Sequence, residues 1–204
     1  PFLTAFILAA SYALWVALER GRRRHWIAYG ASMLLGFYTH NFAFLCAAAH
    51  ALYVLRFHRK SPQLRAWALA LAAAVILYLP WLPSVFPQLA TLRSWPNIRG
   101  PFTLTNLTDL IGMLSFGGEL FGMGTYFRLG VLGHEYRAAL LLPFLLLATF
   151  GAARLGAGKR FYALSYLVVP VAVVGLISLW WNIFYQRYFS FVIPPFVILL
   201  AAGM

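Results

Sequence analysis

The feature of this sequence that most constrains its fold is the alternation of long apolar runs with short basic clusters. Only 10% of the residues are charged and 63% are hydrophobic, whereas a soluble domain carries about 25% charged residues. So small a polar surface cannot solvate a globule, and most side chains must therefore face lipid or one another. We expect an all-α fold, a polytopic transmembrane helical bundle, rather than a soluble domain.

The apolar runs predict about seven membrane segments, of which the last is truncated. A helix needs about 20 residues to cross roughly 30 Å of hydrocarbon, and the first, fourth and sixth segments reach that length. The chain begins without a methionine or a signal-peptide region and stops inside an apolar run, so we expect 1–204 to be a single transmembrane domain and a fragment of a larger chain. The segments are 2–18, 26–38, 42–55, 66–82, 138–153, 161–181 and 189 to the end.

The basic residues predict which side of the membrane each loop faces. The net charge of +12 comes from 16 Lys and Arg against 4 Asp and Glu. A basic balance can indicate nucleic-acid binding, but these charges are concentrated between apolar runs, at 19–24, 56–65 and 154–160. That pattern is typical of cytoplasmic loops of membrane proteins. We therefore expect an integral, multi-pass membrane protein with cytoplasmic basic loops, membrane lipids as neighbours and no nucleic-acid partner.

The same rule predicts a short hairpin over residues 26–57. One helix of that length would extend about 48 Å, far more than the bilayer needs. Because the basic clusters on both sides belong in the cytoplasm, an even number of crossings must separate them. Each arm then spans roughly 20–24 Å. Its tip, Tyr38-Thr39-His40-Asn41, is expected at or slightly below the outer surface.

One long extracytoplasmic loop, 83–137, follows the helix-ending stretch Pro80-Trp81-Leu82-Pro83. Within it we expect an amphipathic helix along the outer leaflet, with Thr103 or Thr105 as N-cap. The glycine-rich stretch 112–133 predicts mobile or tightly turned backbone. A glycosylation sequon at 106–108 is interpreted as chance. The apolar positions at helical spacing are Leu104, Leu107, Ile111 and Leu114.

Polar groups at membrane depth are costly and are therefore functional candidates. His40, with Asn41, could bind an anionic headgroup or phosphate; the alternative is a turn residue in the wet interface. Arg187, at the outer end of the sixth segment, is suited to bidentate phosphate binding; the alternative is a snorkelling interface anchor. Because both are expected at the same depth, His40 and Arg187 could line one site.

Structural interpretations are favoured for the other polar residues. Cys46 is expected to contribute packing only, and His50 is expected to form a hydrogen bond between helices. No metal-ligand spacing and no common nucleophile or phosphate-loop motif is present in the sequence, so catalytic residues, metal and cofactors are left unassigned. The outer acidic residues, Asp109, Glu119 and Glu135, show no diagnostic spacing and are interpreted as structural.

Three stretches carry a resemblance to a known family. They are Leu-Leu-Gly-Phe-Tyr-Thr-His-Asn-Phe-Ala at 34–43, Tyr-Leu-Pro-Trp-Leu-Pro at 78–83, and Arg187-Tyr188-Phe189 with the Pro-Pro pair at 194–195. In their order and spacing the chain resembles the bacterial membrane glycosyltransferases of the GT-C fold. The likeness is to the family-39, protein mannosyltransferase-like and lipopolysaccharide-core sugar transferase type. Asn41 departs from the aromatic residue usual at its position.

The resemblance implies transfer of a sugar from a polyprenyl-phosphate donor to a lipid, glycan or protein acceptor on the outer face of the bacterial inner membrane. It assigns substrate binding to His40, Asn41, Arg187 and Tyr188. It places the catalytic carboxylate on an outer loop upstream of Pro1, so that this fragment alone would be inactive. A transporter or flippase for a lipid-linked or anionic substrate is the alternative, because it would also require polar groups at depth.

Overall fold

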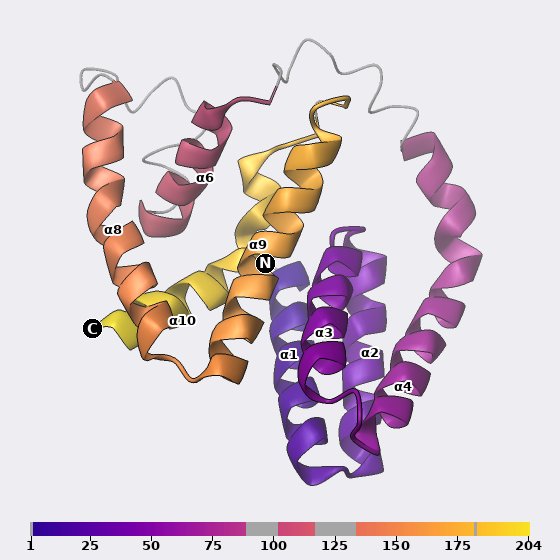
Figure 1. Cartoon of the computed structure of the whole chain (residues 1–204). Helices are drawn as coiled ribbons and strands as arrows, with labels where there is room; N and C mark the ends of the chain where they lie inside the picture. Colours follow the sequence, from indigo (N-terminus) through magenta and orange to yellow (C-terminus); the bar gives the residue numbers. More distant parts are fainter. Residues whose placement is uncertain (1, 89–101, 117–133, 182) are drawn as a thin grey trace. The chain divides into compact units, whose positions relative to one another are not determined.

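The computed structural model describes residues 2–88, 102–116, 134–181 and 183–204 (Figure 1). Over these residues the chain forms helices and no strand, which confirms the all-α class. The chain divides into two compact units, Pro1–Trp95 with Val168–Pro170, and Pro96–Leu167 with Val171–Met204.

The first unit is a cluster of four helices. They are α1 (Phe2–Arg20), α2 (Arg23–Thr39), α3 (Ala43–Phe57) and α4 (Gln63–Tyr78), and the last continues into the 3-10 helix η1 (Leu79–Ser84). Helix α2 lies between α1 and α4 and packs on both. The largest fully buried side chains of the unit are Ile7, Leu14, Tyr29, Met33, Phe37, His50 and Val54.

The hairpin predicted for 26–57 is confirmed as two helices joined by a tight turn. The backbone N–H of His40 donates to the Gly36 carbonyl at 3.0 Å, and that of Ala43 donates to the His40 carbonyl at 2.9 Å. With 17 and 15 residues, α2 and α3 are about 25 and 22 Å long. Figure 1 shows the basic α1–α2 and α3–α4 connections at one end of this unit and the hairpin tip at the other.

The basic connection between α1 and α2 is a two-residue turn that depends on Gly21. Its φ of 65° lies in the left-handed region, where a residue with a Cβ is strained. Its N–H donates to the Ala17 carbonyl at 2.9 Å, which closes the C-terminus of α1 in the usual manner of a left-handed cap. Four arginines, at 20 and 22–24, are thereby held within one sharp turn.

Helix α4 ends where the prolines predict. The α-helical hydrogen bonding stops at Tyr78, and η1 carries Pro80 and Pro83 through the following turn. Proline removes a backbone donor and clashes with the preceding turn, so the regular helix cannot continue. The end of α4 therefore presents the Tyr78–Pro83 stretch beside the hairpin tip.

The second unit contains α6 (Leu104–Phe116), α8 (His134–Arg154), the 3-10 helix η3 (Gln186–Val192), α10 (Ile193–Gly203) and, apart from Val168–Pro170, α9 (Ala157–Ile177). Helices α8 and α10 approach so closely that a Cβ on Gly151 would meet the Leu199 carbonyl, and one on Gly203 would meet the Leu147 carbonyl. Helix α6 packs on α8 and η3. The sequence had placed one apolar segment from residue 189; in the structure α10 begins at Ile193, with prolines in its first turn.

The helix expected within 103–114 is present as α6. Thr103 precedes it, and the Asn106 side-chain oxygen accepts hydrogen bonds from the Thr103 N–H at 2.7 Å and from its hydroxyl at 3.1 Å. The predicted apolar face is only partly correct: Leu114 is buried and Leu107 and Ile111 are half-buried, whereas Leu104 is 79% exposed. Leu110, which the prediction did not include, is buried. Leu104 is the first residue of the helix and lies outside its packing contacts. The position of α6 along the outer leaflet stays a prediction.

Within the part of the chain that the structure describes, three helices are long and apolar enough to cross a membrane: Phe2–Arg20, Gln63–Gln88 and Ala157–Ile177. These are the first, fourth and sixth of the predicted segments, and they support the assignment as a membrane protein. Shorter apolar helices occur at Ala43–Phe57, Ala139–Arg154 and Tyr188–Gly203. The full number of seven segments and the orientation of the loops stay predictions. Most of the glycine-rich stretch, from residue 117 to 133, lies outside the described residues.

Candidate functional site at the hairpin tip

The histidine at the hairpin tip is held by its own turn. Its Nδ1 accepts a hydrogen bond from the Phe42 N–H at 3.1 Å, and the two rings meet edge to face with centroids 4.8 Å apart. A neutral imidazole that accepts at Nδ1 carries its proton on Nε2. Burial lowers the pKa of His40, so the ring is neutral near pH 7 and Nε2–H is a donor of fixed direction.

Asn41 is bound to the end of α4. The Tyr78 hydroxyl donates to the Asn41 side-chain oxygen at 2.8 Å. One turn earlier in the hairpin, the Tyr38 hydroxyl donates to the Leu77 carbonyl at 2.9 Å. The Tyr38 ring also meets Trp81 edge to face at 5.9 Å. The two stretches 34–43 and 78–83, which are separated by more than thirty residues of sequence, are therefore in direct contact in the first unit.

An aromatic cluster packs next to the tip, between the two arms of the hairpin and the end of α4. Phe37 and Phe44, on the two arms of the hairpin, stack with centroids 4.1 Å apart. The Tyr78 ring meets Phe37 at 5.9 Å and Phe44 at 5.2 Å, in both cases edge to face. Such pairs contribute about 0.5–1.5 kcal/mol beyond their buried area. Rigid rings on both arms and on α4 thus fix the position from which His40 and Asn41 project.

A buried polar network lies deeper in the same unit and connects all four helices. Trp67 Nε1 and the Tyr29 hydroxyl are 3.3 Å apart, and that hydroxyl lies 3.4 Å from His50 Nδ1. His50 Nε2 in turn lies 3.2 Å from the Ser11 hydroxyl. Because an indole N–H can only donate, one arrangement uses every proton in order: Trp67 to Tyr29, Tyr29 to His50, and His50 to Ser11. The prediction that His50 hydrogen-bonds between helices is confirmed.

Arg187 and Tyr188 lie in η3 of the second unit. Of Arg187 the structure describes the backbone only. The Tyr188 N–H donates to the Tyr185 carbonyl at 3.0 Å, and the two rings meet edge to face at 5.1 Å. Phe189 and Phe191 are fully buried and anchor η3. His40 belongs to the first unit and Arg187 to the second, so the expectation that they line one site stays a prediction.

Of the other polar residues considered from the sequence, the structure describes the side chains of Cys46 and Asp109. Cys46 is buried in α3, as expected for a packing residue. Asp109 is half-buried in α6. Glu119 lies outside the described residues, and so does the side chain of Glu135. Among the residues that the structure describes, no group of three or more His, Cys, Asp or Glu could hold a metal ion.

Tyr78 is the residue of this site that sequence reasoning missed as a partner. The sequence placed Tyr78 only in the stretch 78–83 that carries the family resemblance, although it bonds Asn41 and contacts both arms of the hairpin. An available signal was its position one turn inside a proline-terminated helix end, the same level at which the hairpin tip was expected. Comparison of the chain with protein-family models, with curated proteins and with solved structures finds no match in any of the three.

Proposed function

We propose that the chain is part of a membrane glycosyltransferase that moves a sugar from a polyprenyl-phosphate donor to a lipid, glycan or protein acceptor. The observation that carries the proposal is the hairpin tip, where a neutral histidine with its proton on Nε2 stands beside the Asn41–Tyr78 hydrogen bond. The contact between the stretches at 34–43 and 78–83 supports it, because these are two of the three stretches in which the sequence resembles this enzyme class. We place the tip at the extracytoplasmic face of a bacterial inner membrane.

In the proposed reaction the acceptor oxygen forms a bond to the sugar anomeric carbon while the bond from that carbon to the donor phosphate oxygen breaks. The acceptor hydroxyl proton passes to a general base, and the polyprenyl phosphate leaves with the bonding electron pair. Negative charge therefore grows on the phosphate as the reaction proceeds. Donors already aimed at that position stabilise the transition state without having to reorganise.

His40, Asn41, Arg187 and Tyr188 are proposed to bind the donor. His40 Nε2–H donates to a phosphate oxygen, and the Arg187 guanidinium binds two of them. The hydrogen bond between Asn41 and Tyr78 holds the hairpin tip against the end of α4. Tyr188 is proposed to position the donor beside Arg187.

The proposal is tested by measuring sugar transfer from a polyprenyl-phosphate sugar by the complete protein reconstituted in lipid. Removal of one preorganised donor costs roughly 10²–10³-fold in kcat, so we expect losses of that order for Arg187→Ala and for His40→Ala. Arg187→Lys should recover little, because an ammonium cannot form the bidentate pair. Arg59→Ala is the matched control, since it removes one guanidinium from the basic end of the first unit.

Membrane insertion of each variant is measured in parallel, by extraction of the membranes with carbonate. Full activity of correctly inserted Arg187→Ala and His40→Ala proteins would refute the assignment of the site. Movement of a lipid-linked substrate across a vesicle membrane, with no new glycosidic bond, would instead support the transporter or flippase alternative and overturn the transferase.

A further inference from the structure

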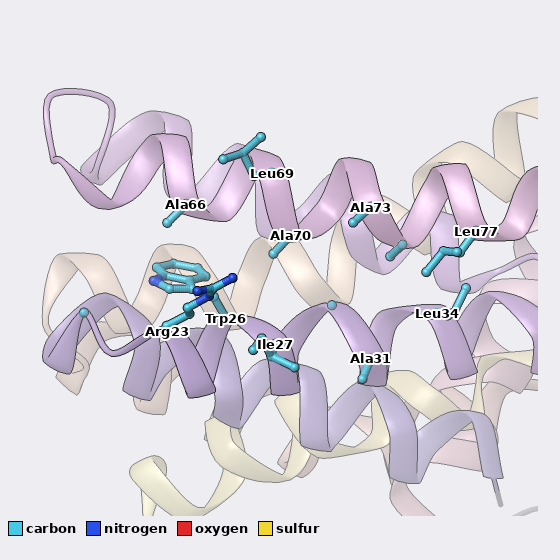
Figure 2. Close-up of a pocket in the computed structure, with 13 residues that line it drawn as sticks. Arg23, Trp26, Ile27, Ala31, Leu34, Ala66, Leu69, Ala70, Ala73 and Leu77 are labelled. Atoms are coloured by element: carbon cyan, nitrogen blue, oxygen red, sulfur yellow. The ribbon is translucent and has the colours of Figure 1, made fainter.

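An apolar groove with one charged end runs between α2 and α4 in the first unit. Its volume is about 640 Å³, within the range of small-ligand sites. Figure 2 shows Ala66, Ala70 and Ala73 of α4 facing α2 across it, with Leu34 and Leu77 at its far end. The groove exists because the residues between the helices are small: a Cβ on Gly30 would stand 3.0 Å from the Ala70 carbonyl.

The other end of the groove is basic. Of the described residues, Arg23 alone among the charged ones lines it, and it lies in the same turn as Arg22 and Arg24. The acidic residue of this turn, Glu19, accepts a hydrogen bond from Trp15 at 2.7 Å. Helix α2 begins at Arg23 with no side-chain cap, so its positive dipole end adds to the charge at this mouth.

Trp26 forms a wall of the groove at the basic end. Its side chain lines the groove beside Arg23 (Figure 2) and is 5% exposed. Its buried indole N–H has no hydrogen-bond partner among the residues that the structure describes. Buried donors are paired in the great majority of native structures, and leaving one unpaired is costly. Because the indole nitrogen itself has almost no exposed surface, Trp26 contributes an apolar wall to the groove and not a donor to a ligand.

We propose that this groove binds an anionic phospholipid of the leaflet adjoining the basic loops, with its phosphate at Arg23 and an acyl chain between α2 and α4. The length of the groove fits one leaflet: Leu34 lies eleven positions after Arg23 in α2, a rise of about 16 Å, and half of the hydrocarbon core is about 15 Å. The charge at the mouth is complementary to an anionic headgroup and not to a second apolar helix. The inference is independent of the proposed transferase, because it uses the opposite end of the unit from His40.

The test is native mass spectrometry of the protein released from nanodiscs that contain equal amounts of phosphatidylglycerol and phosphatidylcholine. We expect retained lipid enriched in phosphatidylglycerol. Arg23→Ala should reduce that preference about 5-fold, the effect of one basic residue at an anionic surface. Arg24→Ala is the matched control, since it removes the same charge from the same turn without lining the groove, and it should leave the retained lipid nearly unchanged.

Two further variants separate lipid binding from general electrostatics. Ala73→Leu fills the groove and should abolish lipid retention, whereas Ala72→Leu, on an exposed position of the same helix, should not. Equal retention of the two lipids by the unaltered protein, retention by Ala73→Leu, or a lipid-free dimer of the chain would each overturn the proposal.

Discussion

The buried network in the first unit gives the sharpest stability prediction, and His50 is the residue to change. It is fully buried, and both of its ring nitrogens lie within hydrogen-bond distance of another helix, at Ser11 and at Tyr29. His50→Leu keeps a comparable apolar volume and removes both hydrogen bonds. The Tyr29 hydroxyl, which is also fully buried, then loses the acceptor for its proton.

The distances set the expected magnitude. At 3.2 and 3.4 Å these bonds lie at the long end of the usual 2.7–3.2 Å range and just beyond it. The average of about 0.6 kcal/mol per hydrogen bond between membrane helices is therefore appropriate for each. The Tyr29 hydroxyl proton, left without its acceptor, adds about 1–3 kcal/mol to the loss of stability. His50→Leu should therefore lower the free energy of unfolding by roughly 2–4 kcal/mol.

A double-mutant cycle separates this cost from a simple loss of packing. Tyr29→Phe removes the hydroxyl that His50→Leu leaves unpaired, and replacing both partners by apolar groups can be nearly neutral. The double variant should therefore be less destabilised than the sum of the two single variants, by about 1–2 kcal/mol. The assay is reversible unfolding in mixed micelles, followed by circular dichroism at constant pH.

The control for the cycle is His58→Leu, the same chemical change at the end of α3 and outside the network. It should alter stability by less than about 0.5 kcal/mol. Strictly additive single effects, or a His50→Leu protein as stable as the unaltered one, would refute the network as a stabilising connection between the four helices.

Three further predictions concern other contacts. Tyr78→Phe keeps the rings packed but removes the donor to Asn41, so it should cost about 0.6 kcal/mol in the same unfolding assay and lower sugar transfer more than Tyr38→Phe does. Gly151→Leu places a side chain against the α10 backbone and should cost at least 1–3 kcal/mol, measured as a lower thermal midpoint in detergent. Because the folded pKa of His40 is lowered by burial, the unfolded chain binds the proton more readily. Stability should thus be full above about pH 6.5, fall as the pH decreases toward the folded pKa, and depend less on pH in His40→Gln.

The elements that could be predicted from the sequence are those decided by charge or by proline. The break near His40 follows from two basic clusters that must lie on the same side, and the end of α4 follows from the loss of backbone donors at Pro80. Gly21 was not singled out, yet its left-handed backbone closes the first basic turn. Its signal was a lone glycine directly after the last residue of an apolar helix pattern.

What could not be predicted is which side chains meet. Tyr29 and Trp67 lie inside apolar segments, where an aromatic residue is expected from packing alone, and nothing local indicates that they lead to His50. The buried face of α6 was predicted only in part. Helical spacing shows which apolar residues share one face, but it does not show which part of the helix other elements cover. Leu104 satisfies the spacing and still lies beyond the contact.

The short arms of the hairpin give a physical reason for its polar tip. Helices α2 and α3, at about 25 and 22 Å, are shorter than the roughly 30 Å of hydrocarbon, so one end of the hairpin must be recessed. The basic end cannot be recessed into the hydrocarbon, because each arginine costs about 2.5–3.5 kcal/mol at the centre of a membrane. The tip carries no formal charge near pH 7, and its polar groups bond one another, at Asn41 with Tyr78 and at His40 with the Phe42 N–H. We therefore expect the tip to lie about 5–8 Å inside the hydrocarbon surface opposite the basic loops, where bulk water has less access. The lipid-linked phosphate of the proposed donor would meet His40 at that depth.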